Sequence, residues 1–182
     1  MATNQMEKKR KMETKKTPEQ EFAEYFKKMY EICNKNGWGD PFSYARGKEI
    51  YMANYLGHKV APKLAGADGY EDKEMTIPVE YKSTTTKTIK ATYNGISVQP
   101  TWEKQLQYLN EEKICKYKNH YFARFDNKGN IVELYKMKCE KVIEYLLPRI
   151  KIQFDKEEKG VDPRIGVSIG KTYILKNSDK LL

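Results

Sequence analysis

The sequence predicts a single mixed domain, of α/β or α+β class, in which helices flank a mixed central β-sheet. Two observations carry this prediction. Apolar residues at helical spacing, followed by glycine, dominate residues 17–56, and the same spacing returns near 101 and 139. Alternating apolar and polar residues dominate 77–84 and 120–137. At 182 residues the chain has the size of one common domain, so both kinds of element should share one fold.

The composition favours a polyanionic partner. The formal net charge is +9, and charged residues make up 32% of the chain. No run of about 18 apolar residues exists to span a membrane. The polar amino terminus lacks the apolar segment of a secretory signal, so we expect a cytoplasmic protein. Cys33, Cys115 and Cys139 form no CxxC pair, and we expect reduced thiols without a disulfide or zinc.

Residues 1–16 are predicted to form a flexible basic arm. They contain six Lys or Arg and two Glu, a composition too polar to fold alone. Such an arm could contact phosphates or could be a solubilising tail. The single domain is predicted to cover 17–182, with a catalytic core at about 43–125.

The first helix has clear end signals. Thr17 can cap it, Pro18 suits its first position, and Gln20 can complete a capping box. Apolar residues then recur at helical spacing up to Cys33, and Gly37 ends the run. A second helix is predicted over 43–56, again followed by glycine.

The later elements follow from local patterns. They are two short strands joined by a charged turn at 71–74, the second beginning at Ile77; a helix capped by Thr101; a hairpin over 120–137 with its turn at 126–130; a helix from 139 that stops near Pro148; and two short strands in 162–175. The "YNG" of 93–95 is predicted to be a turn. The Gly-Lys-Thr of 170–172 lacks the upstream glycine of a phosphate loop, so we interpret it as strand and turn.

The segment "PVEYKST" at 78–84 is the most informative stretch. Ile77, Val79 and Tyr81 should share one face of a strand, and Glu80 and Lys82 the other. Residues two apart on a strand lie about 6.6 Å apart. The chain contains six E-x-K tripeptides, but only this one continues a β-patterned apolar run. The alternative interpretation is a half-exposed strand that carries an ordinary ion pair.

A neighbouring carboxylate would turn this strand into a site. If Asp68 lies on the adjacent strand, it can reach Glu80, and two close carboxylates repel each other unless a cation lies between them. Hard oxygen ligands with room for water and phosphate suit Mg²⁺. The Lys82 ammonium could then orient or activate water and offset charge at phosphorus. Glu71 or Asp72 could be the partner of Glu80 instead.

"GADGY", followed twelve residues after its Asp by "VEYKS", resembles the motif of the PD-(D/E)XK nucleases, typical of type II restriction endonucleases and their mismatch-repair relatives. The resemblance covers about residues 46–84. It implies a restriction-endonuclease-like sheet and Mg²⁺-dependent cleavage of double-stranded DNA by a homodimer. It also implies that Asp68 and Glu80 bind the metal, that Lys82 is the catalytic lysine, and that Glu49 on the preceding helix joins them.

Two residues depart from the family pattern. Ala67 precedes Asp68, where proline is common in the family. Pro78 lies two residues before Glu80, although a central strand needs hydrogen-bond donors, so Pro78 fits best at a strand start or an edge.

The segment after the motif is suited to DNA contact. No Asp or Glu occurs from 83 to 102. Ammonium, hydroxyl and amide groups are the usual donors to phosphates and base edges. The predicted DNA-binding residues are Thr84, Thr86, Lys87, Lys90 and Asn94. The alternative is an exposed threonine-rich strand, since β-branched residues favour strands in any case.

The sequence is also compatible with two other function classes. One is a noncatalytic, basic nucleic-acid-binding protein. The other keeps the nuclease core in a repair or recombination enzyme that nicks DNA. His120 lies among aromatic residues, where a lone histidine is expected to be structural.

Overall fold

The computed structural model describes residues 16–63, 66–156 and 164–182. Its elements in chain order are α1 (Pro18–Lys35), α2 (Arg46–Leu56), β1 (Lys59–Val60), β2 (Gly69–Tyr70), β3 (Pro78–Thr84), β4 (Ala91–Ser97), α3 (Trp102–Tyr108), the π-helical turn η1 (Leu109–Lys113), β5 (Asn119–Phe125), β6 (Ile131–Lys138), α4 (Cys139–Lys156), β7 (Arg164–Ile169), α5 (Lys171–Asn177) and β8 (Asp179–Lys180). The mixed α/β class predicted from the sequence is confirmed.

A mixed six-stranded sheet forms the centre of the fold. Its strand order is β1-β2-β3-β5-β6-β8. β3 and β5 run parallel, and the other neighbours in this sheet are antiparallel. The connection from β3 to β5 contains β4, α3 and η1, and β4 pairs with β7 in a separate antiparallel ribbon. A parallel pair requires such a long crossover.

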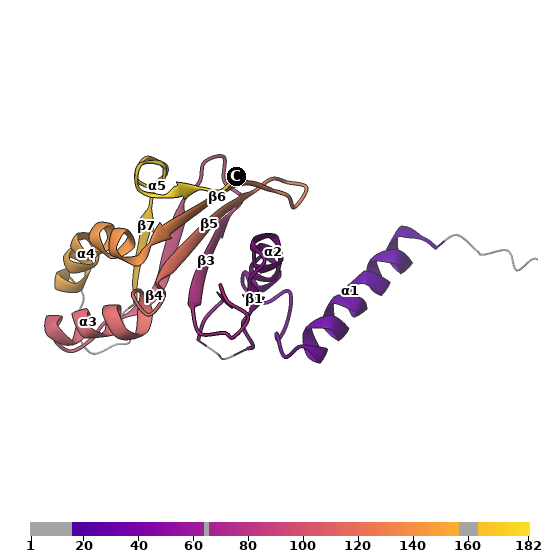
Figure 1. Cartoon of the computed structure of the whole chain (residues 1–182), viewed down its shortest axis with the longest axis horizontal. Helices are drawn as coiled ribbons and strands as arrows, with labels where there is room; N and C mark the ends of the chain where they lie inside the picture. The colour runs from indigo at the N-terminus through magenta and orange to yellow at the C-terminus, as the bar shows by residue number, and fades with distance from the viewer. Residues whose placement is uncertain (1–15, 64–65, 157–163) are drawn as a thin grey trace, which may run out of the picture.

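Each face of the central sheet packs against its own core. On one face, Val79 and Tyr81 of β3 pack with Met52 and Ala53 of α2. On the other, Phe122 of β5 belongs to a larger core formed with the β4–β7 ribbon, α4 and α5. Figure 1 shows α2 on one side of β3 and β5, with α3, α4 and the β4–β7 ribbon on the opposite side. The side chains of β3 therefore alternate between two environments.

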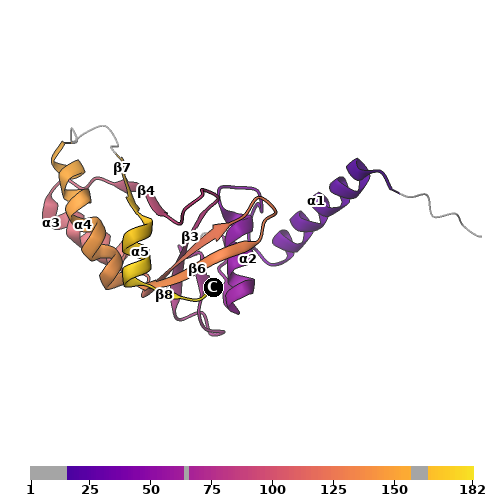
Figure 2. The same cartoon turned by 90° about the horizontal axis from the view of Figure 1, so that it is seen from above.

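The first helix extends away from this body, as Figures 1 and 2 both show. Its N-terminus has the predicted capping box, with Thr17 and Gln20 bonded reciprocally. Of the residues of α1, all of which the structure describes, only Cys33 is buried. Within the described ranges, no helix is both long and apolar enough to cross a membrane.

Several local predictions are confirmed. β2 and β3 form the short antiparallel pair, and Pro78 is the first residue of β3. β5 and β6 form the predicted hairpin, in which Asp126 accepts bonds from the Lys128 and Asn130 N–H groups. The first 15 residues of the predicted basic arm lie outside the described residues.

The second helix is confirmed, and it begins at Arg46, three residues after its predicted start. The predicted end of the helix from 139 is wrong, because tertiary contacts override it. α4 continues through Pro148 to Lys156; proline removes one helical hydrogen bond, but the buried Ile150 and Phe154 hold the helix to the core.

The segments at 93–95 and 170–175 also differ from prediction. Residues 93–95 lie inside β4, where the register shifts between Tyr93 and Ile96 and Gly95 takes a φ of 68°. This is a bulge rather than a turn. Residues 171–177 form the helix α5, whose Ile174 is buried, and not a second strand.

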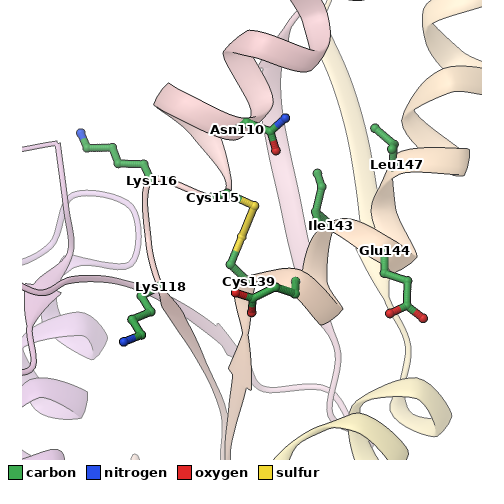
Figure 3. Close-up of a pocket in the computed structure, with 9 residues that line it drawn as sticks. Asn110, Cys115, Lys116, Lys118, Cys139, Ile143, Glu144 and Leu147 are labelled. Carbon is green, nitrogen blue, oxygen red and sulfur yellow. A yellow bond between two sulfur atoms is a disulfide. The ribbon is translucent and has the colours of Figure 1, made fainter.

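The expectation of reduced thiols is wrong for two cysteines. Cys115 and Cys139 form a disulfide with a Cα–Cα distance of 5.4 Å, whereas Cys33 is free and buried. Figure 3 shows the bond at the wall of a cavity of about 640 Å³. The sequence hides this pair because 24 residues separate its members. None of the predicted catalytic residues lines this cavity.

Candidate active site

Asp68 lies immediately before β2 and is fixed by both neighbouring strands. Its C=O accepts a hydrogen bond from the Ala61 N–H at 3.2 Å, and its N–H donates to the Val79 C=O at 3.2 Å. Its Oδ2 accepts a bond from the Tyr81 N–H at 2.7 Å. The carboxylate thus accepts the Tyr81 N–H, which lies beyond the last β2–β3 pair, Gly69 and Val79. Asp68 is therefore held against the middle of β3, as the hairpin prediction requires.

Glu80 and Lys82 lie on the face of β3 opposite the buried Val79 and Tyr81. They form an ion pair, with side chains 17% and 23% exposed. The Lys82 Nζ lies 5.1 Å from the centre of the Tyr93 ring in β4. The strand phase predicted from the sequence is confirmed. A lysine this well covered needs nearby negative charge.

Glu49 approaches the same cluster from the first turn of α2. Its side chain is 18% exposed and pairs with the Arg46 guanidinium at 3.2 Å. Arg46 also donates to the Trp38 C=O at 2.8 Å and to the Ala61 C=O. The arginine thus joins the loop before α2, the helix and the chain after β1. Arg46 is not among the residues predicted from the sequence, although its spacing of three from Glu49 is typical of a helical ion pair.

The electrostatics show that the predicted residues lie close enough to influence one another. Burial raises the pKa of Asp68 to about 8, with Glu80 and Glu49 raising it further and Lys82 opposing them. Burial also raises the pKa of Glu49. Although burial lowers the pKa of Lys82, Glu80 and Asp68 raise it above its ordinary value. Lys82 is therefore an ammonium at neutral pH.

The cluster has a deficit of positive charge. Three carboxylates, from Glu49, Asp68 and Glu80, face two cations, Lys82 and Arg46, so the formal charge is −1 when all are ionised. This deficit contributes to the raised pKa of Asp68, because protonation of Asp68 removes one negative charge from the cluster. A divalent cation would also offset the deficit and would favour the ionised form of Asp68.

Asp68 and Glu80 are the residues that could hold such a cation. Both supply the hard oxygen atoms that Mg²⁺ prefers, and Mg²⁺ keeps several waters. Among residues 16–63, 66–156 and 164–182, no three His, Cys, Asp or Glu side chains lie close enough to hold a metal between them. Two carboxylates with water and phosphate at the other positions would therefore be the binding mode. The donor set fits Mg²⁺ and does not fit a structural zinc site.

His120 and Tyr93 lie behind the ion pair as a buried, neutral support. The His120 ring is fully buried, with Nδ1 2.9 Å from the Tyr93 hydroxyl and Nε2 3.2 Å from the Ile114 C=O. Because the carbonyl can only accept, Nε2 carries the proton, and the Tyr93 hydroxyl donates to Nδ1. Burial lowers the pKa of His120 to about 4. These contacts support the structural role expected for this histidine.

Tyr93 and Tyr117 are further neighbours that the sequence did not indicate. Burial and the nearby charges of Glu80 and Asp68 raise the pKa of both phenols, which therefore stay protonated. The Tyr117 hydroxyl donates to the Gly66 C=O, two residues before Asp68. The interpretation of 93–95 as a turn hid Tyr93.

The two alternative partners of Glu80 lie elsewhere. Glu71 accepts hydrogen bonds from Asn119 and Tyr121 at 2.7 and 2.6 Å and pairs with Lys136 at 3.2 Å. Asp72 accepts bonds from the N–H groups of residues 76 and 77, which closes the loop between β2 and β3. Asp68, not either of these, is the carboxylate that acts on Glu80.

The predicted DNA-binding residues differ in accessibility. Lys87, Lys90 and Asn94 are exposed, and Asn94 lies at the bulge of β4. Thr84 is only 8% exposed, and its hydroxyl lies 2.8 Å from that of Thr86. Thr86 in turn donates to the C=O of residue 88. Thr86 is exposed as well, but the hydroxyls of both threonines bond to neighbouring residues, so Lys87, Lys90 and Asn94 remain for a ligand.

A cavity of about 280 Å³ adjoins the cluster on the α2 side, and its walls include Arg46, Glu49 and Ala67. Tyr44 at its rim is fully exposed and has a φ of 49°. This cavity gives solvent a path to the Glu49 carboxylate. No family model matches the chain, and no curated protein matches it either.

Proposed function

We propose that the protein is a Mg²⁺-dependent endonuclease that hydrolyses phosphodiester bonds of double-stranded DNA, in the manner of a type II restriction enzyme. The observation that carries this proposal is the convergence of Asp68, Glu80, Lys82 and Glu49 on one partly solvent-accessible place. They come from the residue before β2, from β3 and from α2. A strand with an ordinary ion pair has no need of two further carboxylates, one of them with a pKa near 8.

Each residue has a distinct role in this proposal. Asp68 and Glu80 hold the cation, which when bound lowers the pKa of its water and polarises the phosphate. Lys82 orients the attacking water and offsets the negative charge that develops at phosphorus. A bond forms between the water oxygen and phosphorus, and by the family resemblance the bond to the 3′ oxygen breaks. Glu49, which is paired with Arg46, adds negative charge near the cation.

The surrounding charge supports a DNA substrate. The chain has a formal net charge of +9, and a basic protein attracts the phosphate backbone by releasing its counterions. Lys87, Lys90 and Asn94 are exposed on the loop and strand that follow β3. A homodimer would supply two sites for the two strands of a palindromic target.

A plasmid assay tests the proposal. Supercoiled DNAs of several sequences are incubated with the protein and Mg²⁺ or EDTA, beside Lys82→Ala and Lys136→Ala. Lys136 is the matched control, since it is also a partly covered, ion-paired lysine on this sheet. We expect cleavage only with Mg²⁺, and a loss of about 100-fold for Lys82→Ala alone.

The products distinguish the alternatives. Discrete fragments would support a sequence-specific restriction enzyme, whereas nicked circles would favour a repair or recombination nickase. Binding without cleavage of any DNA would overturn the nuclease proposal in favour of a noncatalytic nucleic-acid-binding protein. Equal cleavage by Lys82→Ala would overturn the assignment of the nuclease site to Lys82 and its neighbours.

A further inference from the structure

α1 carries a stripe of large apolar side chains that the described part of its own chain leaves in contact with solvent. Phe22, Tyr25, Met29 and Ile32 are 68%, 59%, 38% and 43% exposed. Their 3-4-3 spacing is that of the a and d positions of a heptad, so they lie along one face of the helix. Figures 1 and 2 show the helix extending away from the sheet. Such a contiguous apolar face marks a surface that a partner covers.

The same helix is anchored to its own chain by a neighbouring face. Phe26 and Tyr30 lie against the Phe42 ring, with centroid distances of 4.9 and 5.8 Å. Cys33 is buried on this side. The anchoring contacts hold the helix in place, while the stripe beside them stays open. The helix is therefore held in a fixed position with its apolar stripe facing solvent.

The charges of α1 identify what can cover the stripe. Its first half, 18–26, contains three Glu and no Lys or Arg, whereas its second half, 27–35, contains three Lys and one Glu. A second α1 in antiparallel orientation places each acidic half beside a basic half. A parallel second copy would place like charges side by side, which is unfavourable.

We propose that α1 is a dimerisation arm, and that its stripe packs antiparallel against the stripe of a second copy of this chain. Phe22 of one copy then lies beside Ile32 of the other, Tyr25 lies beside Met29, and Glu21 comes near Lys35. The interface is isologous, because each contact occurs twice about a two-fold axis. It goes beyond the nuclease proposal and does not depend on it, since its test measures mass rather than cleavage.

Sedimentation of the full chain tests whether α1 forms the dimer interface. Wild type should sediment at micromolar concentration as a dimer of about 42.8 kDa, twice the 21.4 kDa of the chain. Met29→Glu should raise the dissociation constant at least about thirtyfold, the effect of losing a central interface residue. Ala23→Glu, on the opposite face of the same helix, is the matched control and should stay dimeric. Circular dichroism verifies that both variants remain folded.

Charge exchange tests the orientation. Glu21→Lys with Glu24→Lys makes the whole helix basic and should weaken the dimer. Adding Lys28→Glu and Lys35→Glu exchanges the two halves and should restore it, because antiparallel copies are complementary again. A monomeric wild type, equal dissociation of Met29→Glu and Ala23→Glu, or a dimer unaffected by the first exchange would each overturn the proposal.

Discussion

Replacing Asp68 by asparagine should stabilise the metal-free protein while it abolishes cleavage. Burial and the charges of Glu80 and Glu49 raise the pKa of Asp68 to about 8, from an ordinary value of 3.8. Stability that depends on the protonated form is fully present below pH 3.8 and is lost as the pH rises through 8. Asparagine is neutral at every pH, and its side-chain oxygen can still accept the Tyr81 N–H.

The size of the effect follows from this shift. Between pH 3.8 and 8, one extra proton on the folded Asp68 changes the free energy of unfolding by about 1.4 kcal/mol per pH unit. From pH 5 to pH 7, Asp68→Asn should therefore gain at most about 2.7 kcal/mol on wild type. For a chain of this length that gain corresponds to a rise in Tm of about 5–10 °C.

Thermal unfolding in EDTA at pH 5, 6 and 7 measures this gain. The difference in Tm between Asp68→Asn and wild type should grow with pH. Mg²⁺ should raise the Tm of wild type at pH 7 and leave the variant nearly unchanged, since only wild type binds the cation at this site. A variant less stable than wild type at pH 7, or a difference independent of pH, would refute the reasoning.

Two further predictions concern the buried His120 and the disulfide. His120→Gln should reduce the acid sensitivity of the fold. Because the pKa of His120 lies near 4, the unfolded chain binds more protons than the folded chain between pH 4 and 6.5. As the pH falls through that range, the free energy of unfolding, measured with urea, should therefore fall by up to about 3 kcal/mol more in wild type than in the variant. Equal losses would contradict this. Cys115→Ser with Cys139→Ser should lower the free energy of unfolding by about 3.5 kcal/mol, since the disulfide closes a loop of 24 residues. A reductant should lower the stability of wild type by the same amount and leave the double variant unchanged. An equal effect of the reductant on both proteins would contradict this prediction.

The parts of the fold that the sequence predicts are those set by local pattern. Thr17 and Gln20 cap α1 through contacts three residues apart, and the alternation around Tyr81 fixes the two faces of β3. α4 crosses Pro148, and β4 pairs with β7 about 70 residues later, because of packing that no short segment encodes. Local sequence rules therefore fail at elements whose length or pairing is determined by packing in the tertiary core.

The candidate site shows the same division. The spacing of Asp68, Glu80 and Lys82 within one hairpin made their convergence predictable. The contact of Tyr93 with His120 spans 27 residues, and Arg46 reaches a carbonyl 15 residues away, so neither could be inferred from its own neighbourhood. Asp68, Glu80 and Lys82 thus come from one local motif, whereas the residues that support them come from distant parts of the chain.

The initial rate at which supercoiled plasmid disappears, measured against Mg²⁺ concentration for wild type and Lys82→Ala, tests the nuclease proposal most directly. We expect a rate that saturates with Mg²⁺ in wild type and is about 100-fold lower at saturation in the variant. No loss of any tested plasmid at any Mg²⁺ concentration, or equal rates for the two proteins, would contradict the assignment of Asp68, Glu80 and Lys82 as a nuclease site.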